Sequence, residues 1–422
     1  MHSRFAMTVV GPLKQAELRV DPQRIQDRLQ KLAAIGALPG GGVCRLALSD
    51  ADRQARGLVV DWMCELGLSV SIDAIGNITG LRPGRCSGPP VMTGSHIDSV
   101  RSGGIYDGTL GVVAGLEAVE VLNHGGLDTE HSLAVSVFTN EEGVRFTPDM
   151  MGSMVHQGHL ELATALGARD NAGMTVGAEL ERIGYRGVAD SAVVRPRAYV
   201  ELHIEQGPVL EHDTIDIGVV EAVQGISWTK VIVDGVANHA GTTPMARRHD
   251  AGFAAGAITA FVRGLTKRIG NDQVGTVGMI DLSPNVINVI PERAELTVDL
   301  RNTDEERLLA AERELHGFLR RIAEKEGVRI THRQLARFKP VEFDPGMTAL
   351  IEDHARSLGL STKRMSSGAG HDAQAFAPNC PTAMIFVPSV GGVSHSVQER
   401  TRLEDIENGA NVLLKTLRAL AG

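Results

Sequence analysis

The sequence is poor in aromatic residues, has no excess of basic charge and contains no long apolar run. Phe, Trp and Tyr make up only 4% of the 422 residues, which argues against a surface built on aromatic stacking. The formal net charge is −9 at pH 7 and no basic stripe offsets it, so nucleic acid and anionic membranes are not expected partners. No window approaches the roughly 20 apolar residues that a membrane-spanning helix needs.

Cysteine is also scarce, and the spacing of the cysteines argues against two kinds of structural cross-link. The four cysteines are scattered and form no C-x-x-C pair: Cys44, Cys64, Cys86 and Cys380. This spacing argues against a structural zinc site and against a disulfide framework, so we expect reduced thiols. The N-terminal stretch 1–14 contains an apolar run too short for a secretory signal. Together these absences predict a cytoplasmic protein.

What the chain does contain is an alternation of helical and strand-like patterns, long enough for two domains. In its first half, helical spacing occurs at 21–36, 49–67 and 109–123, and strand-like runs occur at 90–95, 131–143 and 198–207. Another strand-like run at 382–388 and a helical pattern at 402–420 follow near the end. Such alternation predicts a layered α/β domain with a largely parallel sheet.

The pattern changes near residue 218 and the α/β alternation resumes at about residue 336. The intervening strand and helix patterns lie at 227–235, 250–268, 273–282, 293–302, 304–326 and 328–335. Their order is β-α-β-β-α-β, which is that of a ferredoxin-like α+β unit. We therefore predict a discontinuous catalytic domain, residues 1–217 and 336–422, into which residues 218–335 are inserted as a second domain.

Side chains that bind metal ions stand at or just beyond the ends of the predicted strands. They are His96, Asp107, the adjacent Glu141 and Glu142, His203 and His395. Ligand sites in open α/β sheets form at the carboxyl ends of the strands, so these loops are expected to converge. Histidine mixed with carboxylate suits zinc or a similar divalent ion.

Three histidines and two acids are too many ligands for one tetrahedral ion, but they fit two ions bridged by a shared carboxylate. Asp107 is the candidate bridge, one of the two glutamates remains free as a base, and Asp98 is placed to hold the second nitrogen of His96. From spacing alone two interpretations stay open. One is a dinuclear site, and the other is a set of unrelated core histidines and solvated acidic turns.

Five motifs resolve this choice through a family resemblance. GSHIDSV (94–100), GGIYDGTLG (103–111), TNEEG (139–143), ELHIEQGP (201–208) and SHS (394–396) are similar to the metal-site signature of the M20 amidohydrolases and peptidases. With MMGS at 150–153, the chain most closely resembles the hydantoinase/carbamoylase branch. That branch comprises N-carbamoyl-L-amino acid hydrolases, β-ureidopropionases and allantoate amidohydrolases.

The resemblance implies a role for each matching residue. His96, Asp107 and His203 would hold one metal ion, and Asp107, Glu142 and His395 the second; zinc is expected, with manganese, cobalt or nickel as alternatives. Glu141 would be the general base and His239 would polarise the scissile carbonyl. The other implied substrate contacts are Gln206 to the ureido group, Asn288 and Arg301 to the carboxylate, and the backbone at Gly370. For His371 and Asp372 we expect a structural loop role instead.

The resemblance also implies an activity and an assembly. The expected reaction is hydrolysis of the carbamoyl C–N bond of an N-carbamoyl-L-amino acid, giving the amino acid, CO2 and ammonia. Alternatives are an allantoate amidohydrolase or a β-ureidopropionase and, more distantly, a di-zinc peptidase or deacylase; a non-catalytic binding module is the alternative from another class. A homodimer is expected, with the insert serving as lid and dimerisation domain and His239 reaching the partner's site.

Overall fold

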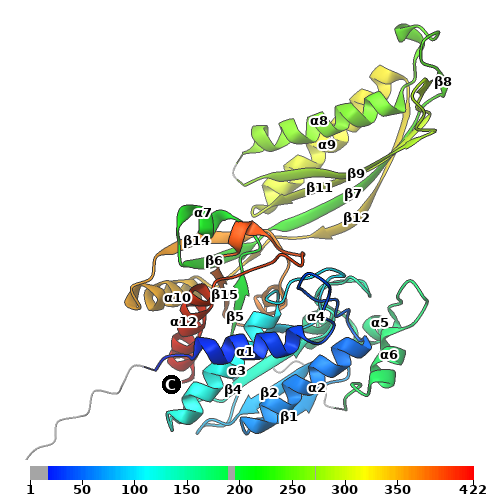
Figure 1. The fold of residues 1–422 in the computed structure, drawn as a ribbon. Coiled ribbons are helices and arrows are strands. Elements are labelled where there is room, and N and C mark those ends of the chain that lie inside the picture. The colour runs from blue at the N-terminus through cyan, green and yellow to red at the C-terminus, as the bar shows by residue number, and fades with distance from the viewer. Residues whose placement is uncertain (1–17, 189–194, 271) are drawn as a thin grey trace, which may run out of the picture.

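The computed structural model describes residues 18–188, 195–270 and 272–422 (Figure 1). The N-terminal apolar stretch considered above lies outside these residues. Within them, no helix is both long and apolar enough to cross a membrane, and the four cysteines are free. The cytoplasmic location stays a prediction.

The larger part of the molecule is built on a nine-stranded sheet with the order β1-β2-β4-β3-β5-β15-β6-β13, in which β14 also pairs with β6. Its strands are β1 (Ser69–Ile72), β2 (Ile78–Arg82), β3 (Val91–His96), β4 (Leu133–Phe138), β5 (Ala198–Ile204), β6 (Ile217–Val223), β13 (Val341–Glu342), β14 (Thr362–Ser367) and β15 (Thr382–Val387).

The sequence predicted a largely parallel sheet, which holds for the central strands and for the β14–β6 pair but not for the other outer pairs. The central strands β4, β3, β5 and β15 are parallel. The pairs β1–β2, β2–β4, β15–β6 and β6–β13 are antiparallel. The short connection between β1 and β2 permits only a hairpin, because a parallel pair needs a crossover of a dozen or more residues. The fold is therefore mixed α/β around a large mixed sheet.

Helices cover this sheet and complete its core. The longer ones are α1 (Pro22–Ala33), α2 (Asp50–Glu65), α3 (Thr109–His124), α10 (Pro345–Ser357) and α12 (Leu403–Ala421). Helix α3 is buried along nearly its whole length and shares a hydrophobic core with α1, α12 and the central strands. Every residue of β3, β4, β5 and β15 is buried, as expected of strands packed on both faces.

A separate four-stranded antiparallel sheet, with the order β12-β7-β11-β9, forms the inserted region. Its elements are β7 (Gly225–Asp234), α8 (Ala251–Ile269), β9 (Val274–Ser283), β11 (Arg293–Asn302), α9 (Glu305–Glu326) and β12 (Arg329–Phe338). This is the predicted β-α-β-β-α-β order. Helices α8 and α9 share a second hydrophobic core with the sheet, and the region projects away from the nine-stranded part (Figure 1).

Strand pairing places the first and last residues of the insert at different positions from those that the sequence pattern predicted. Strand β6 pairs with β15 and β14, so residues 217–223 belong to the large sheet and the insert starts with β7. At its other end, β12 continues to Phe338. The boundaries at 217/218 and 335/336 remain predictions, which this pairing would move to about 224 and 338. The run IGVVEAV has an apolar pattern that either sheet would accept.

Candidate metal and active site

The candidate ligands come from four neighbouring parallel strands. His96 is the last residue of β3, and His203 lies one residue before the end of β5. The loop after β4 carries Glu141 and Glu142, and the loop after β15 carries His395. Because parallel strands end at the same edge of a sheet, these side chains meet there, together with Asp107 from the turn before α3.

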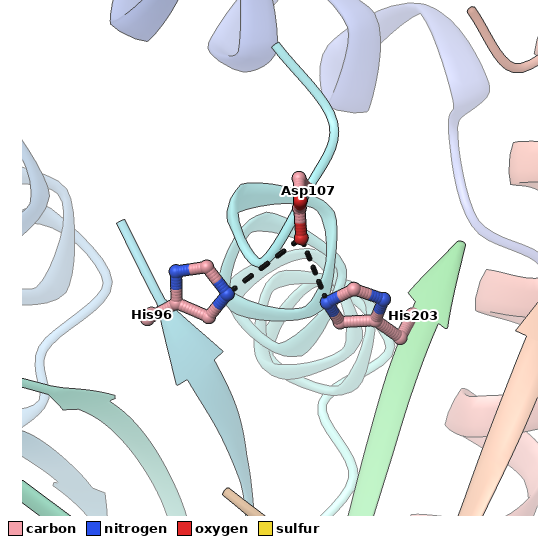
Figure 2. Close-up of side chains that lie close together, drawn as sticks. All are labelled: His96, Asp107 and His203. Carbon is pink, nitrogen blue, oxygen red and sulfur yellow. Dashed lines mark ion pairs between the residues drawn. The ribbon is translucent and has the colours of Figure 1, made fainter. Parts of the chain in front are cut away.

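Asp107 lies at the centre of the group and turns each carboxylate oxygen toward a different set of side chains. Its Oδ1 is 3.7 Å from Nε2 of His96 and 3.2 Å from Nε2 of His203 (Figure 2). Its Oδ2 is 3.2 Å from Nε2 of His395, which is also 3.4 Å from Oε2 of Glu142. Two triads, each with potential ligand atoms within 4.8 Å of one another, therefore share one carboxylate.

Hydrogen bonds on the far side of the two buried imidazoles decide which nitrogen faces this centre. Nδ1 of His96 donates to the backbone carbonyl of Asp98 at 3.0 Å, and Nδ1 of His203 donates to the carbonyl of Ile204 at 2.9 Å. A carbonyl oxygen only accepts, so Nδ1 carries hydrogen in both rings and Nε2 points inward. This is the tautomer that a metal-binding histidine needs, so the donor set fits a cation between Asp107 and the two rings.

The charges of the site also favour a cation. Burial raises the pKa of Glu141 well above its usual value, and the neighbouring Asp372 and Glu142 raise it further. Burial and the charge of Asp107 raise the pKa of Glu142 in the same way. Burial lowers the pKa of His96 to about 4. Buried acids that repel one another and a neutral imidazole with an inward lone pair are stabilised by added positive charge.

The pKa of His203 indicates the same preference of the site for positive charge. Burial alone would lower its pKa, but the hydrogen bond to Asp107 and the charge of that carboxylate outweigh it, and the pKa rises to about 9. The surrounding acids therefore stabilise a positive charge at Nε2 of His203.

Asp98 holds the site together in a way that differs from the prediction. Its backbone carbonyl, not its carboxylate, binds the His96 ring, because the nearest carboxylate oxygen is 3.9 Å from Nδ1. The carboxylate instead accepts hydrogen bonds from the backbone N–H groups of Glu141 and Glu142, both at 3.3 Å. Asp98 thus ties the loop after β3 to the loop after β4.

A cavity of about 210 Å³ lies beside the two triads. Several predicted substrate contacts line it, namely Gln206, Arg301 and Gly370, together with Glu141, which belongs to neither triad. Gln206 donates from Nε2 to Oδ2 of Asp107 at 3.0 Å. Arg301 pairs with Asp299 at 2.9 Å and donates to the carbonyl of Gly368 at 2.6 Å, so it already links the insert to the large domain.

Two predicted substrate contacts do not reach the cavity of their own chain. His239 and Asn288 are exposed and lie beside each other at the short β8–β10 pair, formed by Asn238–His239 and Val289–Ile290. Figure 1 shows β8 at the far end of the insert. Nδ1 of His239 accepts hydrogen bonds from the backbone of Gly241 and Thr242, at 3.0 and 3.2 Å. The catalytic role of His239 stays a prediction.

The structure adds residues that the motifs did not single out. Oε1 of Glu399 accepts hydrogen bonds from the backbone N–H groups of Tyr106 and Asp107, both at 3.1 Å, and Oε2 accepts from Oγ of Ser394 at 2.8 Å. A Cβ on Gly104 would lie 2.0 Å from Oε1 of Glu399. Its position four residues after His395 was the one signal available in the sequence.

Trp228 is another addition, and it lines the cavity together with His371. The expectation for His371 was a structural loop role. Its Nε2 does lie 2.8 Å from Oγ of Ser367 in that loop, but its ring also packs edge-on against His203, with centroids 4.6 Å apart.

Comparison with known proteins agrees with this architecture. A model of the peptidase family M20/M25/M40 matches residues 92–419, and the chain belongs to this family. Among curated relatives, it is 40% identical to an N-carbamoyl-L-amino-acid amidohydrolase of Rhizobium meliloti, over 94% of this chain and 95% of that protein. It is 39% identical to an N-carbamoyl-L-amino acid amidohydrolase of Geobacillus stearothermophilus, over 95% of this chain and 99% of that protein.

A solved structure narrows the assignment within the family. A hydantoinase/carbamoylase family amidase from Burkholderia multivorans superimposes with a TM-score of 0.93 at 42% identity, covering 96% of this chain and 98% of that one. The chain is thus a member of the hydantoinase/carbamoylase branch of the M20 metallohydrolases.

Proposed function

We propose that the protein hydrolyses the carbamoyl C–N bond of N-carbamoyl-L-amino acids, releasing the amino acid, CO2 and ammonia. The observation that carries this proposal is the pair of triads sharing Asp107, beside a cavity that Arg301 lines. The first relatives reported above, which carry this activity in their names, support it over nearly the whole chain.

The cofactor of this proposal is a pair of divalent ions, with zinc expected and manganese, cobalt or nickel as alternatives. His96, Asp107 and His203 would hold one ion, and Asp107, Glu142 and His395 the other. When bound, such ions polarise a carbonyl oxygen and lower the pKa of a water. The inward Nε2 atoms and the crowded carboxylates supply the donor set that this requires.

Glu141 is the proton carrier in this scheme. It belongs to neither triad and faces the cavity, where its Oε2 lies 3.4 Å from Nε2 of His96, and its carboxylate would accept a proton from the attacking water. Burial raises its pKa, which suits a group that must next give the proton to the leaving nitrogen. Both transfers use the same carboxylate, so the reaction ends with Glu141 ready for another cycle.

Substrate orientation falls to side chains of both parts of the molecule. Arg301 holds Asp299 through Nε and Nη2 and the carbonyl of Gly368 through Nη1, so a substrate carboxylate would pair with the remaining N–H groups of Nη1 and Nη2, which the insert supplies. Gln206 and the backbone at Gly370 would contact the ureido group from the large domain. Because the site takes residues from both, closure of the insert over the metal residues would gate catalysis, as lids do in many enzymes.

The proposed assembly is a homodimer formed through the insert. Strand β9 is an edge strand whose Met279 and Ile280 are 42% and 48% exposed, and Ile287 nearby is fully exposed. A long edge with apolar side chains is usually covered by another strand or chain. In such a dimer, His239 and Asn288 would serve the partner's cavity, His239 at the scissile carbonyl and Asn288 at the carboxylate.

A substrate panel tests the proposal. The protein is stripped with a chelator, reconstituted separately with zinc, manganese, cobalt or nickel, and assayed on N-carbamoyl-L-amino acids, N-carbamoyl-β-alanine, allantoate, an N-acetyl amino acid and a dipeptide. We expect the first class to be cleaved fastest and the stripped protein to be inactive. Preference for allantoate or N-carbamoyl-β-alanine would shift the assignment to those activities, and preference for the last two to a deacylase or peptidase.

The role of Glu141 gives a sharper prediction. Glu141→Gln keeps the size of the side chain but removes the proton acceptor, so turnover should fall by at least about 100-fold while metal content stays at the wild-type level. Metal content is measured by elemental analysis and turnover by ammonia release. Glu404→Gln, an exposed change on α12, is the matched control. Near-normal turnover of Glu141→Gln would remove this residue from the base role.

A further inference from the structure

Trp228 is exposed where an indole would ordinarily be covered. The chain has two tryptophans. Trp62 is 5% exposed in the main core, whereas Trp228 is 39% exposed and lines the cavity beside the metal residues. Large apolar surface left open in a cleft is typical of a binding site. An apolar group that enters the cavity would cover the indole.

The strand register places Trp228 beside the proposed carboxylate anchor. In the β7–β11 ladder, Ile226 lies opposite Arg301 and Trp228 lies opposite Asp299, the ion-pair partner of Arg301. Residues directly opposite in an antiparallel pair project from the same face, with Cβ atoms about 5 Å apart. The alternate residues of β11, such as Val298 and Leu300, point into the core under α8 and α9. Ile226 is thus the direct cross-strand neighbour of Arg301 and Trp228 is its diagonal neighbour, on the face that lines the cavity.

This strand register determines which part of a bound acid would face the insert. A carboxylate paired with Arg301 has its α-carbon one bond away, so a substituent on that carbon lies next to Ile226 and within reach of the Trp228 ring. The other cavity residue with an apolar side chain is Ala369, and Gly370 beside it leaves room. The remaining lining side chains are acids, imidazoles, an amide and the Arg301 guanidinium itself.

We propose that Trp228 and Ile226 form the wall that receives the α-substituent of the ureido acid, and that the site therefore selects N-carbamoyl amino acids with apolar side chains. This inference rests on the function proposed above and names the substrate class within it. N-carbamoylglycine and N-carbamoyl-β-alanine carry no substituent to cover the indole. Allantoate would place a second polar ureido group against the wall, which costs free energy because its hydrogen bonds to water are lost.

The test compares the specificity of Trp228→Ala, Trp228→Phe and the wild type. The measured quantity is the ratio of kcat/KM for N-carbamoyl-L-leucine to that for N-carbamoylglycine, using metal-reconstituted enzyme. The contact of one methylene group with an apolar pocket is worth about 10–200-fold in such a ratio. We expect a leucine preference in the wild type, a ratio at least about tenfold lower in Trp228→Ala, and retention of most of the preference in Trp228→Phe.

Tryptophan fluorescence gives a readout that does not depend on turnover. In Glu141→Gln, where substrate binds without being consumed, N-carbamoyl-L-leucine should shift the emission of exposed Trp228 to shorter wavelength, whereas buried Trp62 contributes a constant background. Trp228→Phe should lack this shift. If Trp228→Ala fails to fold, Ile226→Ala serves as the second variant and should lower the same ratio.

The outcomes separate the two proposals. Absence of activity on every carbamoyl compound would contradict the proposed function. Hydrolysis of carbamoyl amino acids with an unchanged ratio in Trp228→Ala or Ile226→Ala, or with no emission shift in Glu141→Gln, would overturn the wall while leaving the proposed function intact. A wild-type preference for N-carbamoylglycine or allantoate would overturn it as well.

Discussion

At the scale of single residues, Glu399 shows how one carboxylate joins two distant loops. Its oxygens bind the backbone of the turn that carries Asp107 and the hydroxyl of Ser394, the neighbour of His395. The side chain accepts in all three hydrogen bonds, which suits an ionised carboxylate. Glu399 therefore fixes the positions of two proposed ligands, while burial and the charge of Asp107 raise the pKa of its carboxyl.

The Glu399→Gln variant should weaken metal binding. Loss of a group that orients metal ligands typically costs 10- to 100-fold in affinity, and we expect a loss of about that size for the ion held by Asp107, Glu142 and His395. Equilibrium dialysis followed by elemental analysis measures both occupancies. Gly104→Ala should have a similar effect, because its Cβ would meet Oε1 of Glu399 at 2.0 Å. If Glu399→Gln binds both metal ions with wild-type affinity, Glu399 has no such role.

The proposed ligands could be named from the sequence because the family motifs contain all five, and because His96, His203 and Glu142 stand at or just beyond strand ends that local patterns reveal. Glu399 and Trp228 could not, for a physical reason. Glu399 meets Asp107 across 292 positions of sequence, and Trp228 gains its place through pairing of β7 with β11. Partners that only the tertiary fold brings together leave no local pattern.

At the scale of elements, the same distinction between local patterns and long-range contacts explains which strands of the large sheet were predicted from the sequence. The central strands were recognisable as continuous apolar runs, and their parallel pairing follows from the helices between them. The edge strands were missed or misassigned because their direction depends on neighbours far along the chain. Strand β6, which lies inside the sheet, was misassigned for the same reason, since its pairs with β14 and β15 join it to residues 362–387.

Helix α4 (Met151–His156) gives a prediction at this scale through its last residue. His156 is 7% exposed, packs against the rings of Phe138 and Phe376, and accepts a hydrogen bond from Gln157 at 2.8 Å. Burial lowers its pKa to about 4. An unfolded histidine titrates near 6.5, so the unfolded state binds a proton first and stability falls as the pH drops from 6.5 toward 4.

Replacing His156 should therefore flatten the pH dependence of stability. Between pH 7 and pH 5, the wild type should lose about 2 kcal/mol more than His156→Gln, which does not titrate. Urea unfolding at both pH values measures this difference. His212→Gln, at a histidine whose side chain is 84% exposed, is the control and should leave the pH dependence as it is. Equal losses in the wild type and His156→Gln would contradict the assignment.

At the scale of the whole molecule, the question is which chain completes each cavity. The metal residues and Arg301 come together within one chain, whereas His239 lies at the exposed end of the insert with Asn288. The family motifs predicted that His239 takes part in catalysis, but they contain no information on the distance between the two ends of the insert. If His239 takes part in the reaction as predicted, its distance from its own cavity suits a site shared between subunits.

Mixing two inactive variants tests this arrangement. His239→Ala retains Glu141, and Glu141→Gln retains His239, so a heterodimer of the two has one site with both groups if His239 acts in the partner's cavity. Random exchange makes half of the dimers mixed, each with one complete site, so activity should return to about a quarter of the wild-type level. If His239 acts in its own chain, neither site of the heterodimer is complete and no activity returns. Subunit exchange is verified by mass spectrometry of differently tagged chains, so the absence of recovery in exchanged dimers would contradict the shared site.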